Sequence, residues 1–310
     1  MRALSVSLCV FVLLTTACQS SNMATSAPVE QMVTTPTRVP AALSSSETPS
    51  PTETATPSPV PAGLIRVDTL EQEVYPFIEN GKCSLAEAIL AANSGEPKDT
   101  CAAGAPDQSV IELMPGEYHF TQSDHTPPQV EWAISTSTGG NALPAVIRAL
   151  TIHGDGAELI RDEGSERFRF FEVMFGRLAL DNMTLQGGDV GEADWGGAIY
   201  AANVSVTLDG VRIVNNYAEN GGGLYLSLGA LTVSNSEFIE NRGGFAGGGI
   251  YLDSAKANIR TSKFVGNQAG GQGGGLRAET VPCQWRTASF CRISLTVRGE
   301  AGSIFIMSMC

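Results

Sequence analysis

Two short segments of apolar and polar positions repeat along the middle of the chain at a nearly constant distance. A run of glycines precedes an apolar residue at Ile199, Leu224, Ile250 and Leu276, and successive copies lie about 25 residues apart. The second segment alternates apolar and polar positions, and its four copies are LALDNMTLQGG from residue 178, VTLDGVRIVNN from 206, LTVSNSEFIEN from 231 and ANIRTSKFVGN from 257. Two segments that share one period indicate a repeat architecture.

Each repeat has the hydrophobic spacing of short strands. In LTVSNSEFIEN the apolar residues Leu231, Val233, Phe238 and Ile239 are separated by polar residues and a short turn. Helical repeats would show a 3.6-residue period over at least three turns, and leucine-rich repeats would show fixed Leu and Asn positions; neither pattern occurs. Coils of this length that stack about 4.8 Å apart form a parallel β-helix. The sequence therefore predicts an all-β solenoid with coils of about 25 residues over residues 110–276.

Glycine and asparagine recur at fixed positions in these coils. Glycine allows positive φ and a close approach of neighbouring backbones, which the sharp turns of stacked coils require. Asn216, Asn241 and Asn267 recur with the same period, so we expect their side chains to form a hydrogen-bonded ladder. The glycine-rich stretches lack the lysine of a phosphate-binding loop and precede strands instead of helices. Both sets of positions are therefore interpreted as scaffold and not as a ligand site.

The N-terminal residues have the pattern of an export signal. Arg2 precedes a mostly apolar run, and the following TTAC resembles a bacterial lipobox, although Leu14 lies four residues before the cysteine where the motif has three. Residues 1–17 are predicted to be a lipoprotein signal peptide, and Cys18 is predicted to carry acyl chains that anchor the protein to a membrane. Secretion with cleavage near Ala17 is the alternative. Either route takes the protein out of the cytoplasm, to the bacterial cell envelope or beyond it.

Residues 18–63 are rich in Ser, Thr and Pro and show no apolar period. This composition predicts an extended, semi-rigid linker, which would hold the folded part away from the anchoring membrane.

Residues 64–109 follow as a predicted N-terminal cap. Ser84 and Glu87 have the spacing of a capping box, and the apolar run after Ser84 predicts a short helix that covers the open end of the solenoid. Cys83 and Cys101 flank this helix, and in an exported chain they are expected to form a disulfide worth about 3 kcal/mol.

The segment CSLAEAILAAN, followed by a second cysteine and then by SVIELMPGEYHF, resembles the CSLREA-type N-terminal module of bacterial surface proteins. The GGGIY and LTVSNSEFIEN coils resemble the repeats of the same proteins and of polymorphic outer-membrane proteins. The resemblance covers residues 82 to 276. It implies a right-handed parallel β-helix at the cell surface or secreted, in most members without an assigned enzymatic activity. Ala86 stands where the motif has Arg, so an ion pair made by that arginine is missing.

Charge and histidine spacing narrow the range of partners. The formal net charge is −13, which argues against nucleic acid because nucleic-acid binders present a basic face. His119, His125 and His153 lack metal-ligand spacing, so no metal site is predicted and each is interpreted as an ordinary surface or strand residue. No cofactor motif and no catalytic triad motif occurs. The expected partners are the anchoring membrane and a surface polysaccharide or a glycan of a host or neighbouring cell.

One acidic loop interrupts the repeats. It contains Asp189, Glu192, Asp194 and Trp195, and the step between copies of the second segment is longest here. Loop insertions in solenoids often form binding surfaces, so these residues are a candidate glycan or ion contact, with the indole stacking on a sugar ring. The alternative interpretation is a solvated acidic turn with the Trp packed at its base. Aspartates that repeat within the second segment are interpreted as turn residues: Asp181 and Asp209.

Three functions follow from these features. The leading hypothesis is a scaffold displayed at the cell surface for adhesion or glycan binding, with no catalytic residue assigned. The alternative is a polysaccharide lyase or glycoside hydrolase, because parallel β-helices also carry those activities and would need paired carboxylates. A passive surface-layer or spacer protein is the third. Ligand binding distinguishes the first from the third, and product release identifies the second.

The residues after Leu276 depart from the repeats. In residues 277–310 the expected second segment is missing, arginine becomes frequent, and Cys283, Cys291 and Cys310 appear. A shifted reading frame or a truncation that removes further coils is the first interpretation. The alternative is a genuine terminal cap, in which Cys283 pairs with Cys291 and the segments ISLTV and SIFIM form the last strands.

Overall fold

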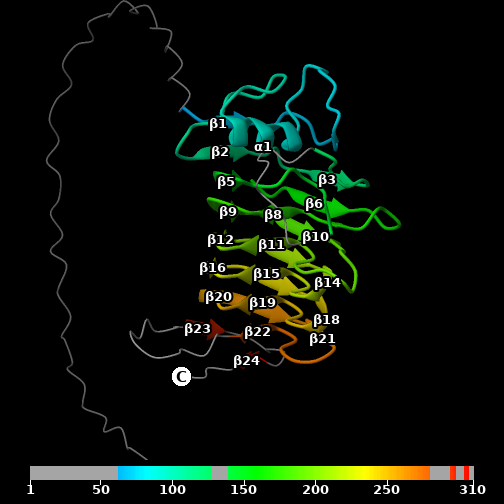
Figure 1. The fold of residues 1–310 in the computed structure, drawn as a ribbon, viewed down its shortest axis with the longest axis vertical. Coiled ribbons are helices and arrows are strands. Elements are labelled where there is room, and N and C mark those ends of the chain that lie inside the picture. Colours follow the sequence, from blue (N-terminus) through cyan, green and yellow to red (C-terminus); the bar gives the residue numbers. More distant parts are fainter. Residues whose placement is uncertain (1–61, 127–138, 280–293, 298–303, 307–310) are drawn as a thin grey trace, which may run out of the picture. The chain divides into compact units, whose positions relative to one another are not determined.

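Parallel strands of successive coils lie side by side through most of the folded chain (Figure 1). The computed structural model describes residues 62–126, 139–279, 294–297 and 304–306. Within these ranges the chain is a parallel β-solenoid of about five coils with a period near 26 residues, preceded by one short helix. The predicted fold class is therefore confirmed. The predicted signal peptide, Cys18 and nearly all of the 18–63 linker lie outside the described residues.

Three long faces and two small sheets make up the coils. The first face contains β1 (Leu64–Arg66), β2 (Ser109–Glu112), β5 (Ala149–His153), β9 (Arg177–Asp181), β12 (Ser205–Asp209), β16 (Ala230–Ser234), the first part of β20 (Lys256–Val265) and β23 (Ser294–Val297). The second contains β3 (Glu117–Phe120), β6 (Glu158–Arg161), β10 (Thr184–Gln186), β13 (Arg212–Val214), β17 (Glu237–Ile239) and the rest of β20. The third contains β8 (Phe171–Val173), β11 (Ile199–Ala202), β15 (Leu224–Ser227), β19 (Ile250–Asp253), β22 (Leu276–Glu279) and β24 (Ile304–Ile306). The small sheets are β14 (Tyr217–Asn220), β18 (Arg242–Ala246) and β21 (Gln268–Ala269), and β4 (Gly140–Asn141) with β7 (Phe168–Arg169).

The pairing register of the strands follows the repeats in the sequence. On the third face Ile199, Leu224, Ile250 and Leu276 pair in turn and form one column. The second repeated segment forms a column on the first face in the same way: Leu178, Val206, Leu231 and Ala257. The period read from the sequence is therefore the length of one coil.

Glycine is required where each coil turns toward the third face. Gly196, Gly221, Gly247 and Gly273 lie three residues before its strands and have φ of +69°, +64°, +63° and +72°. These angles lie in the left-handed region, which glycine adopts without steric cost. A Cβ on the neighbouring Gly248 would clash with carbonyl oxygens of the next coil. The glycine positions thus serve both turn geometry and close stacking.

Apolar side chains from the three faces form one continuous core. Phe238 and Phe264 pair between adjacent coils and stack with ring centroids 4.9 Å apart and planes 6° apart. Complete burial of such a side chain stabilises the fold by about 1.5–3 kcal/mol. Equivalent positions of successive coils therefore stack like on like inside the solenoid.

Asn216, Asn241 and Asn267 form a hydrogen-bonded ladder next to this core. Nδ2 of Asn216 donates to Oδ1 of Asn241 at 2.9 Å, and Nδ2 of Asn241 donates to Oδ1 of Asn267 at 2.9 Å. The backbone N–H groups of Asn216 and Asn241 donate to the same two oxygens at 3.0 and 2.9 Å. All three side chains are buried, so the ladder holds the scaffold and presents no amide to a ligand.

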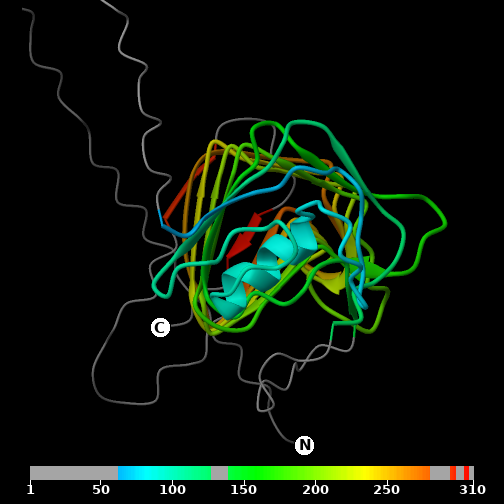
Figure 2. The same cartoon turned by 90° about the horizontal axis from the view of Figure 1, so that it is seen from above.

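The helix α1 (Leu85–Ser94) lies across the N-terminal end of the solenoid, as Figure 2 shows. The backbone N–H of Glu87 donates to Oγ of Ser84, the N-cap, at 3.3 Å, and the Ser84 N–H donates to the Glu87 carboxylate at 3.1 Å. The predicted capping box is therefore confirmed. Burial raises the pKa of Glu87. Leu85 and Ile89 belong to the same core cluster as the strands, so the helix closes the core at this end.

The strand β1 precedes the helix in the chain but belongs to the solenoid. Its three residues pair in parallel with β2 at the start of the first face, and Arg66 Nε donates to Glu112 Oε2 at 2.9 Å. A strand of three residues is too short to show an alternating pattern, so the sequence did not distinguish it from the cap. The first face therefore begins within the segment 64–109 that was predicted to cap it.

Cys83 and Cys101 form the predicted disulfide, with their Cα atoms 4.8 Å apart. Both residues are buried beside the helix N-terminus. The bond joins the start of α1 to the segment that leads into β2, so it ties the cap to the first coil.

Replacing both cysteines with Ala is expected to lower the free energy of unfolding by about 3 kcal/mol, because the unfolded chain loses a closed loop. Denaturant unfolding of the wild type and the double variant in non-reducing buffer measures this difference. Wild type treated with a reductant should unfold at the same denaturant concentration as the variant. Equal stability of wild type and variant without reductant would contradict the prediction.

The last two described strands lie in the C-terminal segment 277–310, which does not follow the sequence repeats. β23 pairs in parallel with β20, and β24 pairs in parallel with β22. These strands lie within the segments ISLTV and SIFIM, whereas Cys283, Cys291 and Cys310 lie outside the described residues. Among the residues that the structure describes, no helix is long and apolar enough to cross a membrane.

Candidate functional site

The loop between β10 and β11 carries the predicted site residues Asp189, Glu192, Asp194 and Trp195. Asp189 and Trp195 each form a parallel bridge with a residue of β14 in the next coil. The loop therefore occupies the position that β14 and β18 occupy in later coils, and its backbone continues the solenoid instead of leaving it.

Asp194 is buried in an ion pair with Arg169. Its Oδ1 lies 3.1 Å from Nη2 of Arg169, and the two residues are 3% and 0% exposed. The backbone N–H of Trp195 donates to the same oxygen at 2.7 Å, and the N–H of Gly139 donates to the other oxygen. A carboxylate that is enclosed and bonded in this way has a structural role, because a ligand would first have to displace the guanidinium.

Arg169, at the end of β7, joins the loop to the preceding coil. Its Nη1 donates to the carbonyl oxygen of Trp195 at 2.7 Å, and its guanidinium carbon lies 5.2 Å from the centre of the Tyr200 ring. The cation thus contacts a carboxylate, a carbonyl group and an aromatic face at once. The sequence did not indicate this partner, since Arg169 lies outside the recognisable repeats.

The other two acidic residues of the loop are less enclosed. Asp189 Oδ2 lies 3.6 Å from Nε of Arg167, and its Oδ1 accepts from the N–H of Gly191 at 2.8 Å. Glu192 is exposed and accepts from the hydroxyl of Tyr217 at 3.2 Å. Burial, and then this hydrogen bond, raise the pKa of Tyr217. The loop therefore does not hold two unengaged carboxylates for acid and base catalysis.

Trp195 begins a stack of aromatic rings on the outer side of the third face. Its ring centroid lies 5.1 Å from that of Tyr225, which stacks in turn with Tyr200 at 5.6 Å and with Tyr251 at 5.4 Å. Each tyrosine directly follows the first apolar residue of a glycine-rich segment, so the three recur with the coil period, a signal that the sequence analysis did not use. Half-buried Trp195 thus packs against protein rings, whereas the turn itself is only partly solvated, since Asp194 is buried.

A polar groove of about 370 Å³ opens outside the asparagine ladder. It is lined by the residues directly before and after the ladder positions: Asn215, Glu240, Arg242, Gly266 and Gln268. The sequence analysis did not single these residues out. The available signal was their position, since a residue next to a buried strand residue in a coil points to the outside.

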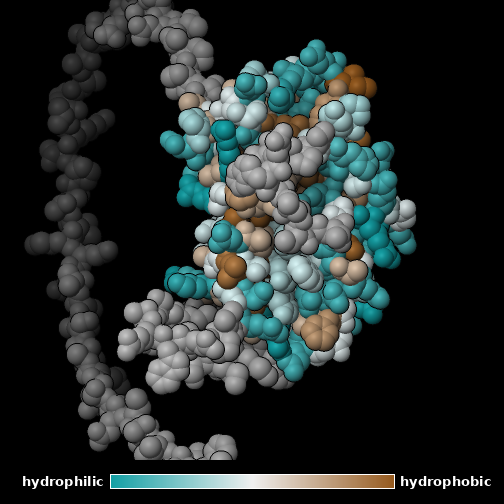
Figure 3. All heavy atoms as spheres, viewed as in Figure 1, coloured by the Kyte–Doolittle hydropathy of each residue, from teal (hydrophilic) through white to brown (hydrophobic). Residues whose placement is uncertain are grey.

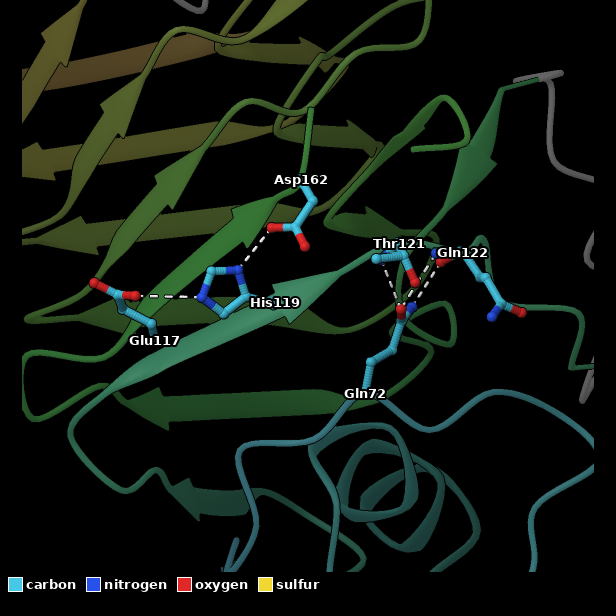
Figure 4. Close-up of polar contacts among 6 residues, drawn as sticks. All are labelled: Gln72, Glu117, His119, Thr121, Gln122 and Asp162. Carbon is cyan, nitrogen blue, oxygen red and sulfur yellow. Dashed lines mark hydrogen bonds and ion pairs between the residues drawn. The ribbon is translucent and has the colours of Figure 1, made fainter. Parts of the chain in front are cut away.

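His119 lies between two carboxylates on the second face (Figure 4). Its Nδ1 is 2.6 Å from Oδ1 of Asp162, and its Nε2 is 3.2 Å from Oε2 of Glu117. Both ring nitrogens face acceptors, so the hydrogen bond to Asp162 and then that to Glu117 raise the pKa of His119. Alternation along β3 places Glu117 and His119 on one side of the strand, which the interpretation of His119 as an ordinary residue did not use.

Replacing His119 with Gln is expected to remove a small, pH-dependent part of the stability. Because the folded-state pKa is raised, protonated His119 stabilises the fold below the unfolded-state value of about 6.5, and this contribution disappears as the pH rises through the folded-state pKa. The side chains are exposed, so the effect is less than about 1 kcal/mol. Unfolding of wild type and H119Q at about pH 5.5 and about pH 8.5 should give the larger difference at the lower pH. A larger difference at the higher pH would contradict this assignment.

A second hollow, of about 750 Å³, lies beside the C-terminal half of α1. Its walls are mostly apolar, with Phe77, Leu90, Ile147 and Phe175 among them. The amide of Asn93 is already hydrogen-bonded within the protein, because it donates to the carbonyl of Ala145 and accepts from the backbone N–H of Ile147.

Figure 3 shows one face of the molecule, on which small hydrophobic patches lie among hydrophilic residues.

The described part of the chain contains no group of three or more His, Cys, Asp or Glu side chains arranged to hold a metal ion. His153 lies 2.6 Å from a carboxylate oxygen of Asp181, in a pair and not in a larger cluster. No family model, no curated protein and no solved structure matches this chain.

Proposed function

We propose that this protein is an exported β-solenoid, displayed at the bacterial cell surface, that binds glycans without acting on them as an enzyme. The observation that supports this most directly is the engagement of the acidic loop. Asp194 is buried against Arg169, and Asp189 lies beside Arg167, so two of the three carboxylates of this loop are engaged within the scaffold. What remains available to a partner is the polar outer surface.

The proposal includes membership in the CSLREA-type surface proteins, on the residues of CSLAEAILAAN, and a lipid anchor on Cys18. The disulfide between Cys83 and Cys101 supports export, because disulfides persist in oxidising compartments.

Radioactive palmitate should label the wild type in bacteria and should not label C18A. Label on both proteins, or on neither, would remove the anchor from the proposal.

Binding and catalysis are separated by one experiment on the chain lacking residues 1–17. The protein is applied to an array of neutral and acidic polysaccharides, and the same polysaccharides are incubated with it and assayed for new reducing ends. Binding without new ends is the expected result. New reducing ends or unsaturated products would replace the proposal with the lyase or hydrolase alternative, and no binding at all would favour the passive spacer.

A further inference from the structure

We propose that the polar groove outside the asparagine ladder is the saccharide-binding site, and that its ligand is a neutral hexose-containing glycan. This inference rests on the proposed glycan-binding function. It names a site and a ligand class which that function leaves open.

The fold builds the groove from two outer columns on either side of the ladder. Asn215, Glu240 and Gly266 form the corner column, with φ of +53°, +52° and +66°, so the chain turns sharply there in three successive coils. Arg242 and Gln268 pair between β18 and β21 and form the column beyond the ladder. With a coil spacing of about 4.8 Å, the groove extends about 10 Å along the solenoid. A volume of about 370 Å³ is in the range of small-ligand sites.

Tyr217 fixes the position of the central cation. The Arg242 guanidinium carbon lies 5.5 Å from the centre of the Tyr217 ring, and the two residues pair between β14 and β18. The hydroxyl of Tyr217 is held in turn by Glu192 at 3.2 Å. A guanidinium stacked on an aromatic ring keeps its donors in one plane, and little side-chain entropy remains to be lost on binding.

The polar side chains of the groove keep their hydrogen-bonding groups available. Within the described residues, no hydrogen bond or ion pair is found for the side chains of Asn215, Glu240, Arg242 and Gln268. Another outward column on the second face is different. There Glu237 lies 2.7 Å from Lys263 and 3.6 Å from Arg212, so its charges are paired within the protein. Several planar polar groups thus converge in the groove with their donors and acceptors open to a ligand.

The combination of groups indicates the ligand. A carboxylate accepts from two adjacent hydroxyl groups, and a guanidinium and two primary amides donate to hydroxyl and ring oxygens. Glu240 and Arg242 cancel one another in charge, and the chain as a whole carries −13. A polyanion would be repelled at long range and would meet Glu240 in the groove. Vicinal hydroxyls of a neutral hexose match both the shape and the charge of the site.

The test uses the chain lacking residues 1–17 with dextran, mannan and galactan as neutral probes and polygalacturonate as the acidic one. R242A and Q268A are expected to weaken binding of the preferred neutral probe about tenfold or more, since each removes hydrogen-bond donors from the ligand. R212A is the matched control, because it removes an exposed arginine of the second face that does not line the groove, and Lys263 still pairs with Glu237. It should bind as the wild type does, and binding should change little with salt.

Three results would overturn the inference, and they differ in what else they reject. If the wild type binds no probe, both the groove and the proposed glycan function are wrong. If it binds but R242A and Q268A bind equally well, the groove is wrong and the glycan function stands. If polygalacturonate is preferred and salt abolishes its binding, the neutral ligand class is wrong. Thermal unfolding of each variant shows that it is folded before binding is measured.

Discussion

Replacing Asn241 with Ala is expected to lower the free energy of unfolding by about 4 kcal/mol. Its Oδ1 accepts from the backbone N–H and the amide of Asn216, and its Nδ2 donates to Oδ1 of Asn267 and, at 2.8 Å, to the carbonyl of Ile213. The residue is 0% exposed, so water does not replace these bonds. Each buried donor or acceptor left without a partner costs about 1–3 kcal/mol. This loss is concentrated at one position because the ladder shares each amide between two coils.

Denaturant unfolding of N241A and of N258A measures this effect against a matched control. Asn258 lies in β20 and is half-buried, and its amide oxygen accepts only from the nearby Arg260 among the described residues, so N258A should cost less than about 1 kcal/mol. N241D keeps the shape and the acceptor but places a carboxylate beside two acceptor oxygens, so it should be at least as destabilising as N241A. A cost below about 1 kcal/mol for N241A would mean that the ladder adds little to stability.

The sequence predicted the coils because a solenoid repeats the same local constraints in every turn. The glycines before Ile250 allow a sharp turn, and the asparagine at position 241 allows a hydrogen bond to the next coil. Both requirements recur one coil later. Period and register are therefore encoded locally. The strand β1 was not predicted, because three residues carry no period and its partner strand β2 lies far along the chain, beyond the helix.

The candidate site was predicted less completely, and the reason is physical. Asp194 was correctly placed in a loop, but its burial depends on Arg169, whose position in the preceding coil no repeat marks. Whether a carboxylate is exposed or paired depends on such non-local neighbours. The same holds for Asp162 beside His119 and for Tyr217 beneath Arg242, since the two residues of each pair come from different coils.

Breaking the ion pair between Arg169 and Asp194 is expected to destabilise the fold by about 3–5 kcal/mol, whichever partner is replaced. In D194N the guanidinium of Arg169 stays buried without its counter-charge. In R169M the carboxylate of Asp194 stays buried without its counter-charge. The double variant R169M/D194N leaves neither charge. The asparagine side chain of this variant can still accept from the N–H of Trp195, as Asp194 does at 2.7 Å. The cost of the double variant should therefore fall short of the sum of the single variants by about 2–3 kcal/mol.

A double-mutant cycle of these three variants by denaturant unfolding gives the coupling directly, and it also bears on function. A catalytic Asp194 would make D194N lose product release and keep its stability, because catalytic groups are not selected for their contribution to folding. A structural Asp194 makes D194N unstable and leaves the glycan affinity of its folded fraction unchanged. Glu192→Gln is the matched control for stability, since that carboxylate is exposed in the same loop and accepts a hydrogen bond from Tyr217. Additive costs in the cycle would contradict the buried pair and return Asp194 to the candidate catalytic residues.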